Sequence, residues 1–272
     1  MYDLDPNLYA ARLKLMTEMK QKAREITLPL FHAPHIDMTN KAGMGSFDPV
    51  TQADKEAEAL MRHMILSQFS KDHIDGEEFP DHVGESDWKW TLDPIDGTRA
   101  FLAGVPVWST LIALSYKDDP IIGMIDLPAM GRTYEGGPNG AWLEDIKGRR
   151  VIKTRPCPTL KAAILGCTEP LSMFSQGERA AYEMIRSGIR FSRLGLDALG
   201  YGLVAQGRMD IIIEAGLKPC DVRALIPIIH GAGGRLTNWH GGSAVDGGQV
   251  VAVGDEGLLP ELYSYLARAM PE

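Results

Sequence analysis

The chain has 272 residues, of which 44% are hydrophobic and 24% charged, and its formal net charge is −8. These values are typical of a soluble globular protein with one large domain or two intimate ones. Because the sequence has no basic stripe, the chain is expected to bind no nucleic acid. Because it has no apolar run of ~20 residues, it is expected not to cross a membrane. The odd set Cys157, Cys167 and Cys220 lacks CxxC spacing, so a reducing cytoplasm is expected rather than disulfides.

Hydrophobic periodicity predicts the elements of the first half in chain order. A helix over 6–31 is followed by a loop or loose hairpin over 34–48 and a second helix over 53–69. The strands expected next lie near 73–77, 89–93, 107–116 and 121–127. A turn at 117–120 and a hairpin around 136–140 indicate that this half is antiparallel.

The second half alternates strands with helices, a rhythm that favours a layered α/β arrangement. The strands are expected at 161–167, 189–194, 209–214 and 249–253. The helices are expected at 176–188, 197–207, 221–231 and 257–269. A soft boundary near 145–155 divides the chain into an N-terminal α+β half, 1–150, and a C-terminal α/β half, 151–272.

The most informative stretch is Asp93-Pro94-Ile95-Asp96-Gly97-Thr98. It places two carboxylates three residues apart, stiffened by proline, directly before a Gly-Thr turn. Hard oxygen ligands therefore stand beside exposed backbone N–H groups, which can hold Mg²⁺ on one side and a phosphate on the other. Alone, the stretch could be a capped turn.

Three further acidic motifs lie where elements are expected to begin or end. They are Asp48-Pro49-Val50-Thr51-Gln52-Ala53-Asp54, Gly76-Glu77-Glu78 and Lys218-Pro219-Cys220-Asp221. Each has a plain structural explanation: Thr51 and Asp54 fit a capping box, paired glutamates are usually a solvated loop, and an Asp often opens a helix. Capping and metal binding are compatible, because a capping Asp can also face a metal.

Taken together and in this order, the four motifs resemble the inositol monophosphatase-like family of magnesium-dependent phosphatases, and the later stretch 231–239 also looks like it. The resemblance implies a layered αβαβα sandwich, a homodimer and two to three Mg²⁺ ions per active site. It also implies a small phosphorylated metabolite as substrate. Since magnesium prefers oxygen ligands and keeps waters, a few carboxylates with a substrate phosphate suffice to hold it.

Carried over position by position, the resemblance implies a role for each residue. Glu77, Asp93 and the main-chain carbonyl of Ile95 would bind the first metal, and Asp93, Asp96 and Asp221 the second, while Glu77 would also serve a weaker third. Gly97 and Thr98 would offer N–H groups to the phosphate. Asp54 and Thr98 would orient the attacking water, and Glu77 would complete the catalytic set.

Two positions depart from the family pattern. The residue before the last metal-binding Asp is usually Trp, and here it is Cys220. The Lys often found shortly before the first motif has no clean match, and Lys41 is the candidate. Whether the Gly-rich loop 34–48 closes over the substrate is left open by the sequence.

Within the family, the run from Gly195-Leu196-Asp197 to Glu214-Ala215-Gly216-Leu217-Lys218-Pro219-Cys220-Asp221 looks most like the histidinol-phosphate phosphatase branch. A cationic substrate between Asp197 and Glu214 would gain charge-assisted hydrogen bonds of about 1.5–3 kcal/mol each. Asp197 as a helix cap and Glu214 as a strand-end residue is the structural alternative. Arg193 is a weaker candidate for a substrate or subunit contact.

L-histidinol phosphate is therefore the expected substrate, hydrolysed in histidine biosynthesis. The chemical alternative is inositol-1-phosphate or another sugar or nucleotide phosphate at the same metal site. An alternative from another class is a regulatory protein of this fold that binds transcription machinery. The complete set of acids argues against lost catalysis, but it does not exclude a second role.

Overall fold

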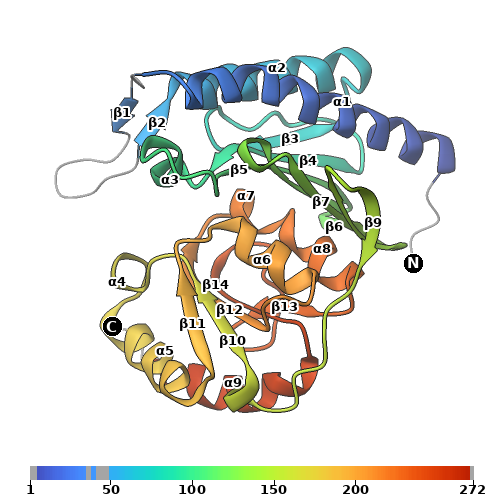
Figure 1. Ribbon diagram of the computed structural model, residues 1–272. Coiled ribbons are helices and arrows are strands. Elements are labelled where there is room, and N and C mark those ends of the chain that lie inside the picture. The colour runs from blue at the N-terminus through green and yellow to red at the C-terminus, as the bar shows by residue number, and fades with distance from the viewer. Residues whose placement is uncertain (1–4, 35–37, 41–48, 270–272) are drawn as a thin grey trace.

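The structure is a computed structural model that describes residues 5–34, 38–40 and 49–269 (Figure 1). Its seven-stranded sheet has the order β3-β4-β5-β6-β7-β8-β9, so neighbours in sequence are neighbours in space. The strands are β3 His73–Gly76, β4 Trp88–Asp96, β5 Ser109–Tyr116, β6 Asp119–Leu127, β7 Arg132–Gly137, β8 Gly140–Asp145 and β9 Gly148–Ile152. The prediction of an antiparallel first half is correct from β4 onward and wrong for β3, which pairs with β4 in parallel.

The second sheet has five strands in the order β11-β10-β12-β14-β13. Its strands are β10 Ile164–Cys167, β11 Phe191–Leu194, β12 Ile211–Leu217, β13 Arg235–Asn238 and β14 Gly248–Val253. β10 is parallel to both of its neighbours, whereas β14 is antiparallel to both of its own. The small pair β1 Met38–Asn40 and β2 Pro49–Thr51 is antiparallel and leads into the second helix.

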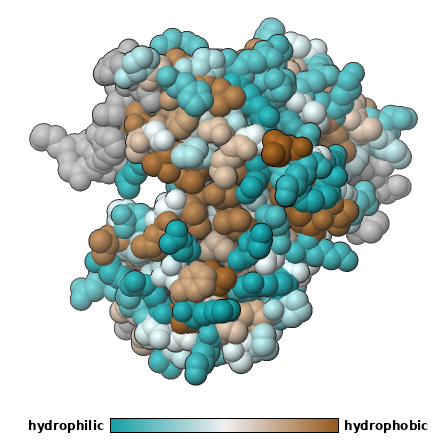
Figure 2. All heavy atoms as spheres, viewed as in Figure 1, coloured by the Kyte–Doolittle hydropathy of each residue, from teal (hydrophilic) through white to brown (hydrophobic). Residues whose placement is uncertain are grey.

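Helices form three layers around the two sheets (Figure 1). The first layer is α1 Pro6–Phe31 and α2 Gln52–Gln68, which pack on the seven-stranded sheet. The middle layer includes α6 Ala198–Ala205 and α8 Leu225–Gly231, and the last layer is α5 Gln176–Gly188 and α9 Leu259–Leu266. The αβαβα sandwich is thereby confirmed. Figure 2 shows hydrophobic residues near the middle of the face, at the level of α6 in Figure 1.

Alternation along β12 shows why the layers form. Ile211, Ile213 and Ala215 share one hydrophobic cluster with residues of α5 and α9, while Ile212 belongs to the cluster of the middle layer. Because successive strand residues point to opposite faces, one strand supplies two cores. Glu214 is on the middle-layer side of this alternation, although it is charged and buried.

The expected single helix over 221–231 is wrong. The chain instead forms α7 Pro219–Val222 and, after a break at Arg223 and Ala224, α8. Pro227 explains the break, because it has no N–H to donate to the carbonyl of Arg223 and its ring crowds that position. The helix expected over 257–269 begins as a 3₁₀ turn, Glu256–Leu258, and α9 ends at Leu266.

Other short helices connect the larger elements. They are α3 Thr98–Leu102, α4 Pro170–Met173 and the 3₁₀ turns Pro128–Met130 and Leu160–Ala162. The division of the chain at 145–155 stays a prediction, since α8 follows that point and packs on β6 and β7 of the first sheet. Within the part of the chain described here, no helix combines the length and the hydropathy needed to cross a bilayer.

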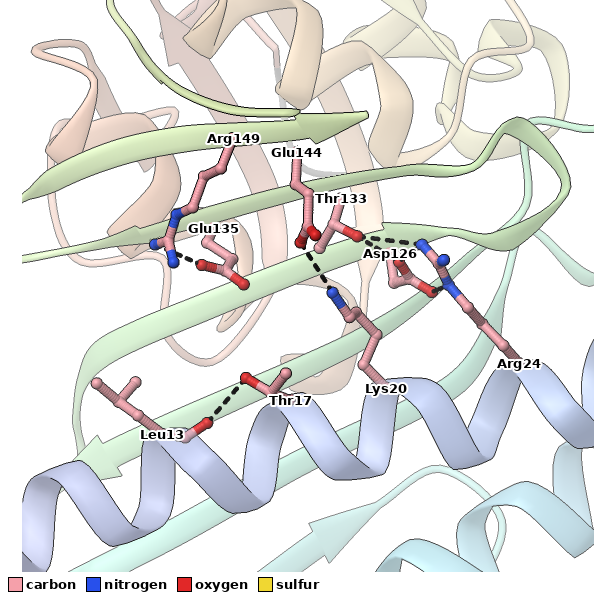
Figure 3. A network of polar contacts seen from close by, with 9 residues as sticks. All are labelled: Leu13, Thr17, Lys20, Arg24, Asp126, Thr133, Glu135, Glu144 and Arg149. Atoms are coloured by element: carbon pink, nitrogen blue, oxygen red, sulfur yellow. Dashed lines mark hydrogen bonds and ion pairs between the residues drawn. The ribbon is translucent and has the colours of Figure 1, made fainter. Parts of the chain in front are cut away.

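A polar network fastens α1 to the first sheet (Figure 3). Arg24 donates to both carboxylate oxygens of the buried Asp126, at 2.7 and 2.5 Å, and the Thr133 hydroxyl donates to Asp126 at 2.7 Å. Lys20 contacts Glu144 at 3.1 Å, but half of the Glu144 side chain is exposed. The Arg24 pair is therefore the desolvated one, and removal of its cation would leave the buried Asp126 charge with only the Thr133 hydroxyl as a partner.

We expect Arg24→Met to lower the free energy of unfolding by about 3–5 kcal/mol, because it strands the Asp126 carboxylate. The matched control Lys20→Met should cost less than about 1 kcal/mol beyond lost packing, because Glu144 stays hydrated. Urea denaturation measures both, and adding Asp126→Asn to Arg24→Met should recover part of the loss. Equal costs for the two single variants would contradict this account.

Candidate active site

The end of β4 carries the first pair of acids, Asp93 and Asp96. A break in the pairing of β4 with β5 sets the direction of their side chains. The register shifts between Asp93, which is opposite Leu111, and Asp96, which is opposite Ser109. Pro94 lies in the gap and has no N–H for the ladder, and such a bulge redirects side chains. Asp93 also accepts the N–H of Ile95 at 3.1 Å, which fixes its carboxylate against its own backbone.

Asp96 is held between strand β5 and helix α6. Its Oδ2 accepts the Ser109 hydroxyl at 3.0 Å and the backbone N–H of Ala198, the first residue of α6, at 3.1 Å. The next residue, Gly97, has φ +80°, a left-handed conformation that glycine adopts at little cost, and α3 begins directly after it. The Thr98 hydroxyl donates to the carbonyl of Ile95 at 3.1 Å.

Glu77, directly after β3, and Asp221, on α7, complete the acidic set. Asp221 accepts the backbone N–H of Lys218 at 2.7 Å, which orients the carboxylate at the start of its short helix. The Lys218 ammonium contacts Glu77 at 2.8 Å. This contact was not predicted; the sequence signal was a lysine three residues before the last acid.

The ligand atoms of these residues converge in two overlapping groups. Those of Asp93, Asp96 and Asp221 lie within 4.8 Å of one another, and so do those of Glu77, Asp93 and Cys220. Asp93 belongs to both groups. The first is an all-oxygen donor set that suits a hard cation such as Mg²⁺, whereas the second adds a sulfur. The four acids expected to bind metal are therefore brought together.

Burial and mutual repulsion raise the pKa values of these carboxyl groups. Burial, then the charges of Glu77 and Asp96, raise the pKa of Asp93 well above its usual value. Burial and the charge of Asp197 do the same to the pKa of Asp96. Burial, with Glu77 nearby, raises the pKa of Asp221 to about 6. A bound divalent cation would reverse this effect, because it favours the charged forms.

Asp54 has the capping role that the sequence allowed. It is 1% exposed, and its Oδ2 accepts the backbone N–H and the hydroxyl of Thr51, at 2.8 and 2.6 Å. Burial, with a smaller contribution from Glu78 and Glu77, raises the pKa of Asp54 to about 6. Asp54 thus lies close enough to the acids to feel their charge.

A cavity of about 360 Å³ opens over the acids. Its lining includes Glu77, Asp93, Ile95, Asp96, Gly97, Thr98, Asp197, Glu214 and Asp221. Asp54 and Arg193 are not among the described residues that line it, and Arg193 is exposed on β11. Lys41 and most of the loop 34–48 fall outside the described residues. The roles given to Arg193, Lys41 and this loop stay predictions.

Glu214 is a buried residue of the cavity lining. Its two oxygens accept the Thr168 N–H and the Tyr201 hydroxyl, each at 2.8 Å, and burial raises the pKa of Glu214 to about 7. Neither Thr168, which follows β10, nor Tyr201, on α6, was predicted, because only the packing of these elements beside β12 brings them to Glu214. A cationic ligand in the cavity would stabilise the charged form of Glu214.

Asp197 enters the cavity from a strained turn. Its φ of +46° and ψ of −144° are unusual for any residue other than glycine, and its side chain makes no helix-capping hydrogen bond. A Cβ at Gly97 would lie 3.0 Å from the Asp197 carboxyl carbon, so Gly97 leaves room for that carboxylate. Burial raises the pKa of Asp197 to about 6, and the charge of Arg99 opposes the shift.

Arg223 ties the strands of the site to the segment after α7. Arg223 is 8% exposed. Its guanidinium donates to Asp75 on β3 at 2.7 Å and to the Thr91 hydroxyl on β4 at 3.3 Å. It also donates to the carbonyl of Val245. Asp75 and Thr91 each lie two residues before a site acid. The break between α7 and α8 therefore carries a cation that holds three segments of the site together.

A family model for the inositol monophosphatase family matches residues 9–270. The chain belongs to this family. The chain is similar to the bifunctional phosphatase IMPL2 of Arabidopsis thaliana, with 41% identity over 213 residues, which are 75% of this chain and 58% of that protein. A histidinol-phosphatase of Chlorobaculum parvum is 31% identical over 238 residues, 87% of this chain and 89% of the relative.

The fold agrees with the family. A solved inositol monophosphatase of Zymomonas mobilis superposes with a TM-score of 0.83 at 35% identity, covering 95% of this chain and 98% of that one. As a member of the inositol monophosphatase family, the chain is a phosphoric monoester hydrolase. The overlapping acidic groups at the end of β4 are where such a hydrolase would hold its cations.

We expect the metal-free protein to lose stability as the pH rises from about 4 to 7. An unfolded Asp or Glu titrates near pH 4, whereas Asp54, Asp197 and Asp221 titrate at about 6 and Glu214 at about 7 in the fold. The folded state thus holds more protons in this window, so deprotonation destabilises it. Thermal unfolding in a chelator measures this loss, and Mg²⁺ at pH 7.5 should reverse it.

The variant Asp221→Asn tests whether repulsion between carboxylates, rather than a general disturbance of the fold, lowers the stability of the metal-free protein. It should raise the metal-free free energy of unfolding at pH 7.5 by on the order of 1 kcal/mol and reduce the stabilisation by Mg²⁺. The matched control is Asp210→Asn, a buried acid paired with Arg155 at 2.6 Å outside the cavity. The control should destabilise the protein and keep the full Mg²⁺ response. Destabilisation of metal-free Asp221→Asn would contradict the repulsion.

Proposed function

We propose that the chain hydrolyses L-histidinol phosphate to L-histidinol and inorganic phosphate with Mg²⁺. The observation that carries the proposal is a second pair of carboxylates, Asp197 and Glu214, in the same cavity as the four acids of the metal groups. The four acids of the metal groups suit an anionic phosphate with its cations, and the second pair suits a cationic leaving group. The histidinol-phosphatase among the relatives supports the same substrate.

The reaction needs little covalent chemistry from the protein. A water oxygen attacks phosphorus in line, the ester P–O bond breaks, and the histidinol oxygen leaves with a proton that comes from the water. Bound Mg²⁺ would lower the pKa of water and offset the charge of the phosphoryl oxygens. Glu77, Asp93, Asp96, Asp221 and the carbonyl of Ile95 would hold these ions, two to three in number.

The remaining residues would position the reactants. Thr98 lies on the cavity wall at the start of α3, and its N–H and that of Gly97 would face phosphate oxygens. Its hydroxyl, which donates to the carbonyl of Ile95, keeps lone pairs that can accept a hydrogen bond from the attacking water. We propose that Asp54 and Glu77 act with Thr98 in orienting this water.

Asp197 and Glu214 would select the substrate by charge. Each titrates above its usual range in the fold because it is buried, so each gains from a nearby cation. The ammonium or imidazolium of histidinol supplies that cation, while the hydroxyl groups of inositol supply none. A charge-assisted hydrogen bond of about 1.5–3 kcal/mol corresponds to a preference of about 10–100-fold.

We expect Asp197→Asn to lower the ratio of kcat/KM for histidinol phosphate to that for inositol-1-phosphate by about 10–100-fold. Asn is chosen because it tolerates left-handed backbone better than Ala. Phosphate release from a panel of esters at saturating Mg²⁺ measures the ratio. Slow hydrolysis of p-nitrophenyl phosphate, a generic ester, should persist in the variant.

Arg193→Gln is the matched control, since Arg193 is a charged neighbour of the turn that does not line the cavity. Its substrate ratio should stay within about twofold, a difference worth less than about 0.5 kcal/mol. Equal or faster turnover of inositol-1-phosphate by the unaltered protein would overturn the substrate assignment and favour the sugar phosphate alternative. The homodimer, the cytoplasmic location and a regulatory role stay predictions from the sequence.

A further inference from the structure

Cys220 is the one thiol of the chain's three that lies in a group of candidate metal ligands within the described residues. It is buried in α7 between Pro219 and Asp221, and its Sγ lies 3.5 Å from Asp221 Oδ1. The ligand atoms of Glu77, Asp93 and Cys220 are all within 4.8 Å of one another. Tetrahedral ligands at about 2.0–2.3 Å from a Zn²⁺ ion are about 3.3–3.8 Å apart, so the three atoms must draw together by up to about 1.5 Å to share one cation.

The chemistry of sulfur separates this group from its all-oxygen neighbour. Mg²⁺ is a hard cation that takes oxygen ligands, and a thiol adds nothing to its binding. Zn²⁺ and Co²⁺ accept thiolate together with carboxylate. At the position where a family member usually has an indole, this chain therefore has a ligand that discriminates between classes of cation.

We propose that Glu77, Asp93 and Cys220 form a mixed carboxylate–thiolate site that binds a soft divalent cation such as Zn²⁺ more tightly than Mg²⁺. On binding, the S–H bond breaks, a sulfur–metal bond forms, and the proton passes to solvent. No oxidant or reductant takes part. The inference rests on the proposed metal site, but not on the identity of the phosphate ester.

The shared ligand gives the site a consequence for catalysis. Asp93 belongs to both groups, so a cation bound through Cys220 competes for a carboxylate that the all-oxygen group also needs. Zn²⁺ should therefore inhibit hydrolysis in the presence of Mg²⁺, and the inhibition should weaken when the thiol is removed. A thiol that merely fills space beside Asp221 would give neither effect.

The test is a titration of the metal-free full-length protein with Co²⁺ alone and with Zn²⁺ alone. Co²⁺ should produce the near-ultraviolet absorption of a thiolate–cobalt bond, and this absorption should vanish in Cys220→Ser. Calorimetry should show that Cys220→Ser weakens Zn²⁺ binding at least about tenfold, as loss of a ligand requires, and changes Mg²⁺ binding less than about twofold. Cys157→Ser, at a buried thiol outside both groups, should keep the absorption and the Zn²⁺ affinity.

Absence of the absorption in the unaltered protein, its persistence in Cys220→Ser, or an unchanged Zn²⁺ affinity overturns the proposal. Circular dichroism checks that the variant folds, and Cys220→Ala repeats the test if the serine variant does not. Because metals alone are the probes, rejection of histidinol phosphate as substrate leaves these outcomes readable. Conversely, a normal substrate preference with no thiolate–cobalt absorption rejects only the soft-cation site.

Discussion

The repulsion among Asp93, Asp96, Asp221 and Glu77 is the constraint on which the site depends. Asp93 is 1% exposed and sits among carboxylates whose charges raise its pKa. Without cations this arrangement lowers the stability of the fold, since buried acids without cations cost free energy. The cluster makes sense as a receptor for divalent cations, and the cost of assembling it is offset when they bind.

The surrounding fold holds the acids in place with neutral donors and a few cations. Asp96 is fixed by a hydroxyl of β5 and a backbone N–H of α6, and Asp221 by a backbone N–H of its own short helix. Arg223 then joins β3, β4 and the segment after α7. The site thus lies where both sheets meet the middle layer, so neither half of the chain could build it alone.

The local hydrophobic pattern of the sequence was enough to predict much of the fold. Periodicity predicted α1, α2 and α5 nearly to the residue, since each of these helices carries a continuous buried stripe. The break between α7 and α8 was missed, although Pro227 is visible in the sequence, because hydrophobic residues continue across it. The parallel pairing of β3 with β4 depends on the path of the intervening loop, which no periodicity encodes.

The candidate site likewise contains residues that the sequence predicted and residues that it did not. Its acids were predicted because motifs of known chemistry carry them, whereas their partners were not. The contacts of Arg223 with Asp75 and of Lys218 with Glu77 join segments 148 and 141 residues apart. The contact of Tyr201 with Glu214 joins two consecutive elements, α6 and β12. Such contacts follow from the packing of layers rather than from spacing.

Anomalous scattering from a crystal soaked in Mn²⁺ tests the central claim most directly. We predict ions within coordination distance of Asp93 and its neighbouring acids, and ions bound only elsewhere would contradict the claim.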